Sequence, residues 1–431
     1  MRQGWSAGLA GGALGLLLVA CSSGTSGDHP PVGGAAGDDN AGGAPPELAG
    51  FNPFPMLGKS CRAGIADDPE SEYGPLGFFP CRSGEADCQE PDWAGSLSWN
   101  PTGAGDLLLY SLQVSLDPTG AVTRLMLSKQ YPISPGSSDT PQEAVAYSLP
   151  DGAPLAALRN LGDDGNDSSA AGAKSSCALM PAAADEGLVL VAAASGRTAL
   201  SWGYAPYETA TSPFALQPFS ADPTALLTGL FASGEVAGLT EDDGAIWRLD
   251  LPTMMVTRAQ GDTQRLWLDG AIGDELLLRN LDRTKYITMA VDGATPVAVD
   301  GSWLRGDGER LAWLVTAASG VEVWGAARDG RAPSKSARKL ATLEHATAIT
   351  AVTLGDGALA VQYQTSQVGA GSLARTVDLV DLADGSVRSR TRDDDTFLLL
   401  ANTADTVWVG EAAIIRDDTR QFERVLRLLY R

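Results

Sequence analysis

The sequence repeats one short pattern of β-prone runs and turns, and this pattern constrains the fold more than any other feature. Its clearest copy covers residues 302–341, where SWLRGDG, ERLAWLVT, SGVEVWGAARDG and APSKSARKLA follow one another. Runs rich in β-branched and aromatic residues, separated by Gly- and Asp-containing turns, are typical of short strands. We therefore expect these roughly forty residues to form one four-stranded antiparallel sheet.

An apolar run, a small or acidic turn and a second apolar run occur together seven times. We expect the second run to be strand b of its sheet, beginning near residues 106, 187, 235, 274, 309, 357 and 405. A third β-prone run, expected to be strand c, ends in Asp-Gly at Asp292-Gly293, Asp329-Gly330 and Asp384-Gly385. Asp-Gly suits the two positive-φ positions of a type I′ turn, so we expect such turns between strands c and d. We expect the strands to follow from the outer edge inward.

Seven similar sheets predict a closed ring. A single sheet of this kind has two partly apolar faces and cannot bury both, whereas sheets stacked around an axis bury one another. Residues 96–431 therefore resemble the β-propeller architecture, an all-β fold with seven four-stranded blades. The Gly-His and Trp-Asp dipeptides of WD40 repeats do not occur periodically, so the resemblance transfers no functional residues. The last copy stops at its c strand, and we expect a strand near residues 49–57 to fill the vacant d position.

Tryptophans recur at similar places in the copies. Trp202, Trp247 and Trp324 fall in expected c strands, while Trp99, Trp267 and Trp303 fall in expected a strands. Large aromatic side chains at repeated positions most simply fill the space between neighbouring blades. Stacking against a ligand is the alternative.

The first residues are typical of an export signal. Arg2 precedes an apolar run over residues 9–20, and the segment Leu18-Val19-Ala20-Cys21 is similar to the lipobox of bacterial lipoproteins. The run is too short to span a membrane and fits the core of a signal peptide. We expect residues 1–20 to be removed; the alternative is an ordinary secretion signal with a cysteine by chance.

Lipidation would anchor the mature chain. The resemblance implies that the Cys21 thiol takes acyl chains such as palmitate, and several chains hold a protein stably on a membrane. Ser22 rather than Asp follows the cysteine, which favours the outer membrane, on its periplasmic face or at the cell surface. Residues 21–50 are rich in Gly, Ala and Pro and are expected to form a flexible tether.

The remaining cysteines, Cys61, Cys81, Cys88 and Cys177, are even in number and belong to an exported chain. This predicts two disulfides. We favour Cys61 paired with Cys81 or Cys88 and the other of these paired with Cys177, although three pairings are possible. A zinc site is the alternative, but no Cys-x-x-Cys spacing occurs. Residues 51–95, rich in Gly, Pro and acids, are expected to be an irregular extension pinned by these bonds.

Composition and motifs narrow the function. The net charge of −22 argues against nucleic acid and anionic lipid surfaces as partners. No His-Glu-x-x-His, Gly-x-Ser-x-Gly or phosphate-loop motif occurs, and neither His29 in the tether nor His345 between two blades has an evident nucleophile nearby. We therefore predict no catalytic residue and no cofactor or metal site. The acidic runs at 163–167 and 393–395 are calcium candidates, and solvated loops are the alternative. The Gly-rich run at 369–374 is expected to be a hairpin loop.

Two functions remain open. The first is a lipid-anchored binding or scaffolding module at the outer membrane, with a protein or glycan partner and no catalysis. The second is an extracytoplasmic enzyme that acts on glycans through carboxylates dispersed over the propeller face. A binding module should present a broad polar and aromatic face, while an enzyme should present a funnel with converging acids of raised pKa.

Overall fold

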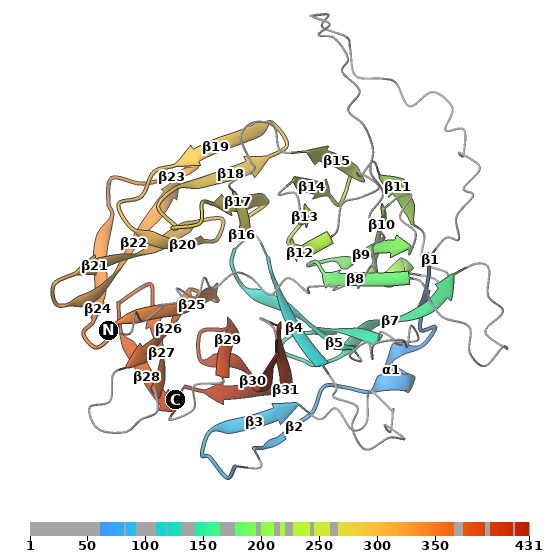
Figure 1. The fold of residues 1–431 in the computed structure, drawn as a ribbon, viewed down its shortest axis with the longest axis horizontal. Coiled ribbons are helices and arrows are strands. Elements are labelled where there is room, and N and C mark those ends of the chain that lie inside the picture. The colour runs from blue at the N-terminus through green and yellow to red at the C-terminus, as the bar shows by residue number, and fades with distance from the viewer. Residues whose placement is uncertain are drawn as a thin grey trace, which may run out of the picture.

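The computed structural model describes residues 61–81, 83–91, 109–117, 119–130, 143–163, 177–194, 200–210, 216–219, 227–241, 245–258, 266–365, 374–392, 397–416 and 419–430. In this part the regular structure is almost entirely β, with only helix α1 (Pro69–Tyr73) and the 3-10 turn η1 (Tyr207–Thr209) besides the strands. The strands form seven sheets around one axis, a seven-bladed β-propeller (Figure 1). The predicted fold class is therefore confirmed. The predicted signal peptide, Cys21 and the tether lie outside the described residues.

The first three blades follow in chain order. Blade 1 contains β4 (Leu109–Leu116), β5 (Val122–Gln130), β6 (Glu143–Ser148) and β7 (Pro154–Asp163), with β1 (Cys61–Ile65) added outside β7. Blade 2 contains β8 (Cys177–Ala183), β9 (Gly187–Ala194), β10 (Leu200–Pro206) and β11 (Gln217–Phe219). Blade 3 contains β12 (Leu227–Ser233), β13 (Val236–Glu241), β14 (Ile246–Asp250) and β15 (Met255–Arg258).

The other four blades complete the ring. Blade 4 contains β16 (Trp267–Ile272), β17 (Glu275–Arg279), β18 (Tyr286–Ala290) and β19 (Gly293–Val297). Blade 5 contains β20 (Ser302–Gly306), β21 (Arg310–Ala317) and β22 (Gly320–Asp329), and β22 pairs with both β23 (Ala332–Pro333) and β24 (Arg338–Leu343). Blade 6 contains β25 (Ala348–Gly355), β26 (Ala358–Thr365), β27 (Ala374–Asp381) and β28 (Val387–Arg392). Blade 7 contains β29 (Phe397–Asn402), β30 (Thr406–Arg416), β31 (Thr419–Leu429), β3 (Cys88–Pro91) and β2 (Phe78–Pro80).

The first strand of each blade is the innermost one, which reverses the expected order. The first strands of neighbouring blades contact one another around the axis, as β16 contacts β20 and β20 contacts β25. Burial explains this order. Strand β27 is buried along nearly its whole length, whereas the arginine-rich β28 alternates between exposed and half-buried residues and forms the outer edge of its blade. Apolar runs therefore lie inside, where blades cover both of their faces.

The sequence pattern located most strands correctly. Six of the seven predicted b strands begin within one residue of the observed starts. The first prediction was wrong, because the run near residue 106 leads into the inner strand β4 and strand b of this blade is β5, which begins at Val122. In that region the apolar-turn-apolar pattern can be assigned to either of two successive pairs of runs along the chain. Residues 92–108 lie outside the described part.

The Asp-Gly pairs lie between strands c and d as predicted, but they do not form type I′ turns. Gly293, Gly330 and Gly385 have positive φ, while the aspartate before each one does not. Both residues have positive φ in the a–b turn of blade 6, at Asp356 (φ 50°) and Gly357 (φ 75°). Two consecutive residues with positive φ, as a type I′ turn requires, therefore occur between strands a and b of blade 6 and not between strands c and d, where we expected them.

An N-terminal strand closes the ring, at a different place from the one expected. β3 pairs with β31 through Cys88 opposite Leu428 and Gln89 opposite Arg427, so it takes the vacant d position of blade 7. The predicted residues 49–57 lie outside the described part. The segment 61–91 is not irregular as expected, because it adds β1 to blade 1 and the β2–β3 hairpin to blade 7. In Figure 1 this hairpin lies beside β31.

Arginines on β28 hold this closing blade. Residues two apart on a strand share a face, so Arg388, Arg390 and Arg392 form one row. Arg388 donates to the carbonyl oxygen of Tyr430 at 2.7 Å and Arg390 to that of Leu429 at 2.6 Å. Arg392 pairs with Glu85 of the N-terminal hairpin at 3.1 Å. The row therefore joins blade 6 to both chain segments that form blade 7.

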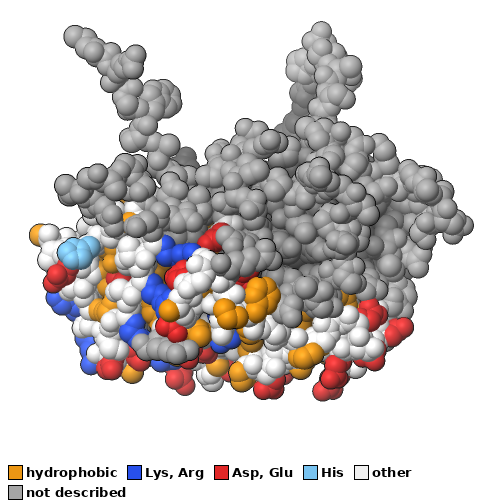
Figure 2. All heavy atoms as spheres, turned by 90° about the horizontal axis from the view of Figure 1, so that it is seen from below, with side chains coloured by type: hydrophobic (Ala, Val, Ile, Leu, Met, Phe, Trp, Pro, Cys, Tyr) orange, Lys and Arg blue, Asp and Glu red, His pale blue; other side chains and the backbone are white. Residues whose placement is uncertain are grey.

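Surface features complete the description. Figure 2 shows the ring edge-on, and acidic, basic and hydrophobic side chains are interspersed over the part that is not grey. Among the described residues, no helix has the length and hydropathy needed to cross a bilayer.

Candidate functional site

The ring has two faces with different connections. One, here called the a–b face, carries the a–b and c–d turns; the other, the d–a face, carries the b–c loops and the links from one blade to the next. All seven a–b turns contain an acidic residue: Asp117, Asp185, Glu235, Asp274, Asp307, Asp356 and Asp405. These acids serve the turns themselves in part, since Asp117 accepts hydrogen bonds from the backbone amides of Thr119 and Ala121.

The a–b turn of blade 1 lies at the centre of the a–b face. The backbone amide of Gly234 in blade 3 donates to the carbonyl oxygen of Leu116 at 3.0 Å. The amide of Asp356 in blade 6 donates to the carbonyl oxygen of Gly120 at 2.8 Å, and a Cβ on Gly120 would lie 2.6 Å from the Cβ of Asp307 in blade 5. A turn that touches blades 3, 5 and 6 occupies the middle of the ring, and Figure 1 shows β4 extending into this region.

The inner strands of blades 3 to 7 each contain a bulge. The pairing of strands a and b slips at Leu227–Gly229, Leu268–Gly270, Ser302–Arg305, Ile349–Ala351 and Leu399–Ala401. A bulge bends a strand and redirects the side chain of the extra residue, and bulges are common next to active and binding sites. In blade 4 the extra residue is Asp269.

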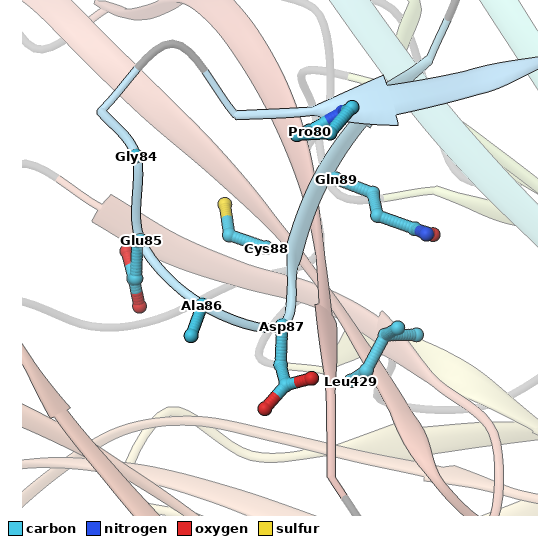
Figure 3. Close-up of a pocket in the computed structure, with 8 residues that line it drawn as sticks. All are labelled: Pro80, Gly84, Glu85, Ala86, Asp87, Cys88, Gln89 and Leu429. Atoms are coloured by element: carbon cyan, nitrogen blue, oxygen red, sulfur yellow. The ribbon is translucent and has the colours of Figure 1, made fainter.

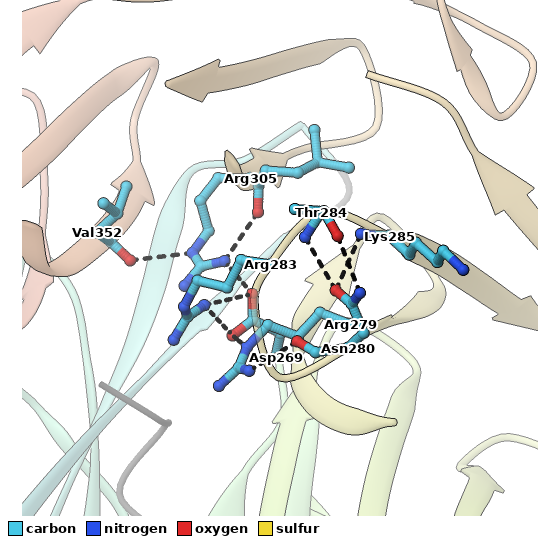
Figure 4. A network of polar contacts seen from close by, with 9 residues as sticks. Asp269, Arg279, Asn280, Arg283, Thr284, Lys285, Arg305 and Val352 are labelled. Carbon is cyan, nitrogen blue, oxygen red and sulfur yellow. Dashed lines mark hydrogen bonds and ion pairs between the residues drawn. The ribbon is translucent and has the colours of Figure 1, made fainter. Parts of the chain in front are cut away.

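Three arginines surround the carboxylate of Asp269 (Figure 4). Arg279 Nε donates to its Oδ1 at 2.8 Å, Arg283 Nη1 donates to the same oxygen at 2.9 Å, and Arg305 Nη1 donates to Oδ2. The Asp269 side chain is 1% exposed. Arg305 also donates to the carbonyl oxygen of Val352 at 3.0 Å. This group, here called the Asp269 cluster (Asp269, Arg279, Arg283 and Arg305), therefore spans blades 4 and 5 and reaches blade 6.

Burial and charge set the ionisation of the Asp269 cluster. Burial raises the pKa of Asp269, but the guanidinium groups of Arg305, Arg283 and Arg279 outweigh it and hold the pKa below its usual value. Burial lowers the pKa of Arg283 to about 10, against the opposing effect of Asp269. Asp269 is therefore a charged partner of the arginines and is poorly suited to be a general acid or base.

The Asp269 cluster continues to a tryptophan on the d–a side. The guanidinium of Arg283 lies over the Trp303 ring, 3.6 Å from its centroid, a cation–π contact. Both residues have φ of 58°, in the left-handed region that non-glycine residues rarely adopt. Nearby, Trp267 lies opposite Arg279 in the β16–β17 pair, and 53% of its surface is exposed. Leu281, in the same b–c loop as Arg283, is 64% exposed.

Among the described residues, two other acids, the exposed Asp356 and the buried Asp378, have raised pKa values, and they do not converge. Burial raises the pKa of Asp356, and the charges of Asp405 and Asp117 raise it further. Burial also raises the pKa of Asp378, which accepts a 2.8 Å hydrogen bond from the Tyr363 hydroxyl. Asp356 lies on the a–b face, whereas Asp378 lies in β27 beside the Tyr363 hydroxyl. The two carboxyls are thus in separate surroundings.

A shallow pocket of about 330 Å³ lies on the N-terminal hairpin (Figure 3). Its lining includes Glu85, Asp87, Cys88 and Leu429. The Glu85 and Asp87 carboxylates pair with Arg390 at 3.7 and 3.5 Å. The pocket therefore belongs to the ring closure, and its charged groups are engaged there.

The predicted cysteine pairing was not observed. Cys81 and Cys88 form a disulfide with each other, with their Cα atoms 5.4 Å apart. This bond spans the β2–β3 hairpin, which brings the two residues together, and so it excludes a bond from either one to Cys61 or Cys177. Backbone pairing places Cys61 at the start of β1 and Cys177 at the start of β8. In the described part of the chain no group of three or more His, Cys, Asp or Glu residues is arranged to hold a metal ion.

Other predicted positions had mixed outcomes. His345 is exposed between β24 and β25, as expected for a link between blades. Trp202 is completely buried among residues of blades 1 to 3, which confirms the predicted packing role, but the exposure of Trp267 contradicts it. Trp99, residues 164–167 and 393–395 of the calcium candidates, and residues 369–373 of the Gly-rich loop lie outside the described residues.

Sequence reasoning did not identify the Asp269 cluster. Its members are dispersed over WLDG, LLLRNLDR and SWLRG, in two blades, and none belongs to a motif. Only the recurrence of Trp before a charged residue in two inner strands, Trp267 before Asp269 and Trp303 before Arg305, was a visible signal.

Comparison with known proteins assigns no family to this chain. No known protein family matches the sequence, and no curated protein matches it. Similar solved structures include an oligogalacturonate lyase from Vibrio parahaemolyticus, at 10% identity and a TM-score of 0.45, covering 82% of this chain and 96% of that one. The β-propeller domain of the trilobed protease from Pyrococcus furiosus has 10% identity and a TM-score of 0.41, covering 73% and 95%. The acylaminoacyl peptidase from Pyrococcus horikoshii has the same identity and TM-score, covering 73% and 50%. Likeness at this level assigns no function to this chain.

Proposed function

We propose that this protein is a lipid-anchored, extracytoplasmic propeller that acts as a non-catalytic binding or scaffolding module at the outer membrane. The observation that carries the proposal is the position of the Leu116–Val122 segment. It lies in the middle of the a–b face, in contact with blades 3, 5 and 6. The d–a face is left for recognition, and there the exposed Trp267 and Leu281 lie on the elements that carry a buried charged cluster.

The carboxylates support binding over catalysis. A pair of acids that cleaves a glycosidic bond must face one sugar from two sides. Asp269 is fully engaged by arginines, and Asp356 and Asp378 lie in separate surroundings. No specific observation favours the glycan-acting enzyme.

The anchor rests on the sequence. Cys21 after Leu18-Val19-Ala20 is the proposed lipidation site. Incorporation of radiolabelled palmitate tests this directly: we expect labelling of the wild-type protein in a bacterial host and none of C21S. Labelling of both would contradict the assignment.

A binding experiment with paired variants tests the module. The purified protein and W267A/L281S would be immobilised and exposed to outer-membrane extract, and retained molecules identified by mass spectrometry. Met255 and Val291, which are 55% and 57% exposed beside c–d turns, provide the control M255S/V291S. We expect a ligand that wild type and control retain, that W267A/L281S loses, and that binds again when pure. Conversion of that ligand to a product, or the absence of any ligand dependent on Trp267 and Leu281, would refute the proposal.

A further inference from the structure

The Asp269 cluster carries more positive charge than its own carboxylate balances. Three guanidinium groups face one carboxylate, and both of its oxygens accept hydrogen bonds from them. Within the described part of the chain, the ion pairs of Arg279, Arg283 and Arg305 all go to Asp269. Buried charges are usually paired, so two positive charges without a second carboxylate point to an anion supplied from outside the chain.

All three arginines have donors to spare, since Arg279 too uses only Nε and Nη1 in the hydrogen bonds of the described residues. Arg305 uses Nε and Nη1 in its hydrogen bonds, and Arg283 uses Nη1, which leaves Nη2 of each outside the hydrogen bonds of the described residues. The Arg305 side chain is 16% exposed, compared with 3% for Arg279. The guanidinium of Arg305 is thus the member of the cluster that an incoming anion would meet first. The Nη2 of a guanidinium group donates charge-assisted hydrogen bonds, which a carboxylate accepts.

The backbone around the cluster is held in an unusual conformation. Arg283 and Trp303 are two of the five non-glycine residues with positive φ among the described residues, and they contact each other. Such conformations persist only where the surrounding structure enforces them, and they concentrate at ligand sites. The bulge at Asp269 adds a second irregularity at the same place. The arrangement fixes the arginines before any ligand arrives.

The exposed neighbours indicate what accompanies the anion. The indole of Trp267 lies at the start of the same inner strand as Asp269, opposite Arg279, and is half exposed. An exposed indole offers a flat apolar surface with a polar N–H, which suits the C–H face of a sugar ring. A carboxylate beside a sugar ring is the chemistry of a uronic acid.

We propose that the d–a face of blades 4 and 5 binds a glycan that carries uronic-acid carboxylates. Arg305 and Arg283 receive a carboxylate, and Trp267 packs against the sugar ring. This inference rests on the proposed binding function and specifies its ligand. An acidic peptide would offer the same carboxylate without the ring, and it is treated as a competing outcome.

Titration of the purified protein with three probes tests the inference. These are a short oligoglucuronate, the corresponding oligoglucose and a poly-glutamate peptide, followed by calorimetry and by tryptophan fluorescence. We expect saturable binding of the oligoglucuronate, weakened by added salt, and no binding of the oligoglucose. R305M should weaken the binding by about tenfold or more, because it removes the charged group whose Nη2 would donate to the carboxylate.

Two further variants keep the test decisive. Arg305 also holds Asp269, so the thermal unfolding of R305M must be compared with wild type, and W267A provides an independent variant with the cluster intact. W267A should weaken oligoglucuronate binding several-fold. Arg331 pairs with Glu275 at 2.7 Å and with Asp292 near a c–d turn, so R331M is the matched control and should bind normally.

The outcomes separate the ligand class from the function. Absence of saturable oligoglucuronate binding, equal binding of the oligoglucose, equal or tighter binding of poly-glutamate, or indifference to both R305M and W267A would each overturn the inference. If the outer-membrane capture still yields a ligand dependent on Trp267 and Leu281, the binding function stands and only the uronic-acid assignment fails.

Discussion

The carboxylate of Asp356 in blade 6 accepts a 2.6 Å hydrogen bond from the backbone amide of Val122 in blade 1. The two residues are 234 positions apart, and the amide of Asp356 returns a bond to the Gly120 carbonyl oxygen. Blades 6 and 1 are not neighbours in the ring. The contact therefore crosses the centre of the molecule, and the a–b turn of blade 1 links blades that would otherwise meet only through others.

The raised pKa of Asp356 makes this contact dependent on pH. Because the folded-state pKa lies above the unfolded value of 3.8, the native state holds the proton more tightly, and this residue's contribution to stability falls as pH rises through that interval. Asn keeps the acceptor oxygen and tolerates positive φ. We expect D356N to be more stable than wild type at neutral pH, and the difference to vanish towards pH 3.8, in thermal unfolding measured across pH.

Asp292 provides a control of opposite sign. The hydrogen bond from Arg331 lowers the pKa of Asp292. The contribution of this residue to folding stability is therefore present above its unfolded-state pKa and is lost as the pH falls through its folded-state pKa. D292N should therefore be slightly less stable than wild type at neutral pH. Parallel pH profiles for the two variants would contradict the assignment.

Gly120 has no room for a side chain. Its φ is 84°, and a Cβ would lie 2.6 Å from the Asp307 Cβ. We expect G120A to lower the free energy of unfolding by more than about 2 kcal/mol in denaturant titration, from backbone strain plus collision. Gly330 has φ of 60° with nothing within 4 Å, so G330A isolates the strain and should cost about 1 kcal/mol. Equal losses would show that the centre of the ring is loosely packed.

Replacing Asp269 should be severe. D269N leaves three arginines facing one another in a buried site, and breaking a buried ion pair in this way costs about 3–5 kcal/mol. Chemical unfolding at neutral pH measures the loss. Below the lowered pKa of Asp269 the wild type loses the same pairs, so the two proteins should converge in strong acid. A D269N protein as stable as wild type at pH 7 would remove the structural role assigned to this carboxylate.

Loss of the Cys81–Cys88 bond should loosen ring closure. The bond spans a separation of seven residues, and a loop of this size contributes about 2 kcal/mol in the chain-entropy model. We expect C81S/C88S to unfold at lower denaturant concentration and to exchange amide hydrogens faster in β3 and β31 than in blade 3. Uniformly changed exchange, or none, would mean that the hairpin does not hold blade 7.

The architecture was readable from the sequence because its signal is local and repeated. An apolar run, a turn and another apolar run locate strands such as β21 and β26 within a residue. The turn type was not readable, because an Asp-Gly pair fits several connections and strand twist decides among them. The cysteine pairing failed for a related reason: proximity of Cys81 to Cys88 depends on the β2–β3 hairpin, in a segment without a repeat.

The candidate site was hidden because closure of the ring creates it. Asp269 and Arg305 are 36 residues apart and meet only when blades 4 and 5 pack together. Arg283 turns towards them because its backbone is left-handed, a conformation that its residue type does not predict. Trp267 and Trp303 were noticed, but periodicity alone could not separate a packing tryptophan from an exposed one.

The composition of blade 7 bears on how the protein is made. Its strands come from residues 78–91 and 397–429. The β2–β3 hairpin is therefore synthesised long before β31, the strand with which it pairs. During synthesis the β2–β3 hairpin has no strand to pair with until the final strands have been made. A chain interrupted before β31 would present open sheet edges instead of a closed ring, and would be open to aggregation and to proteases that degrade unfolded chains.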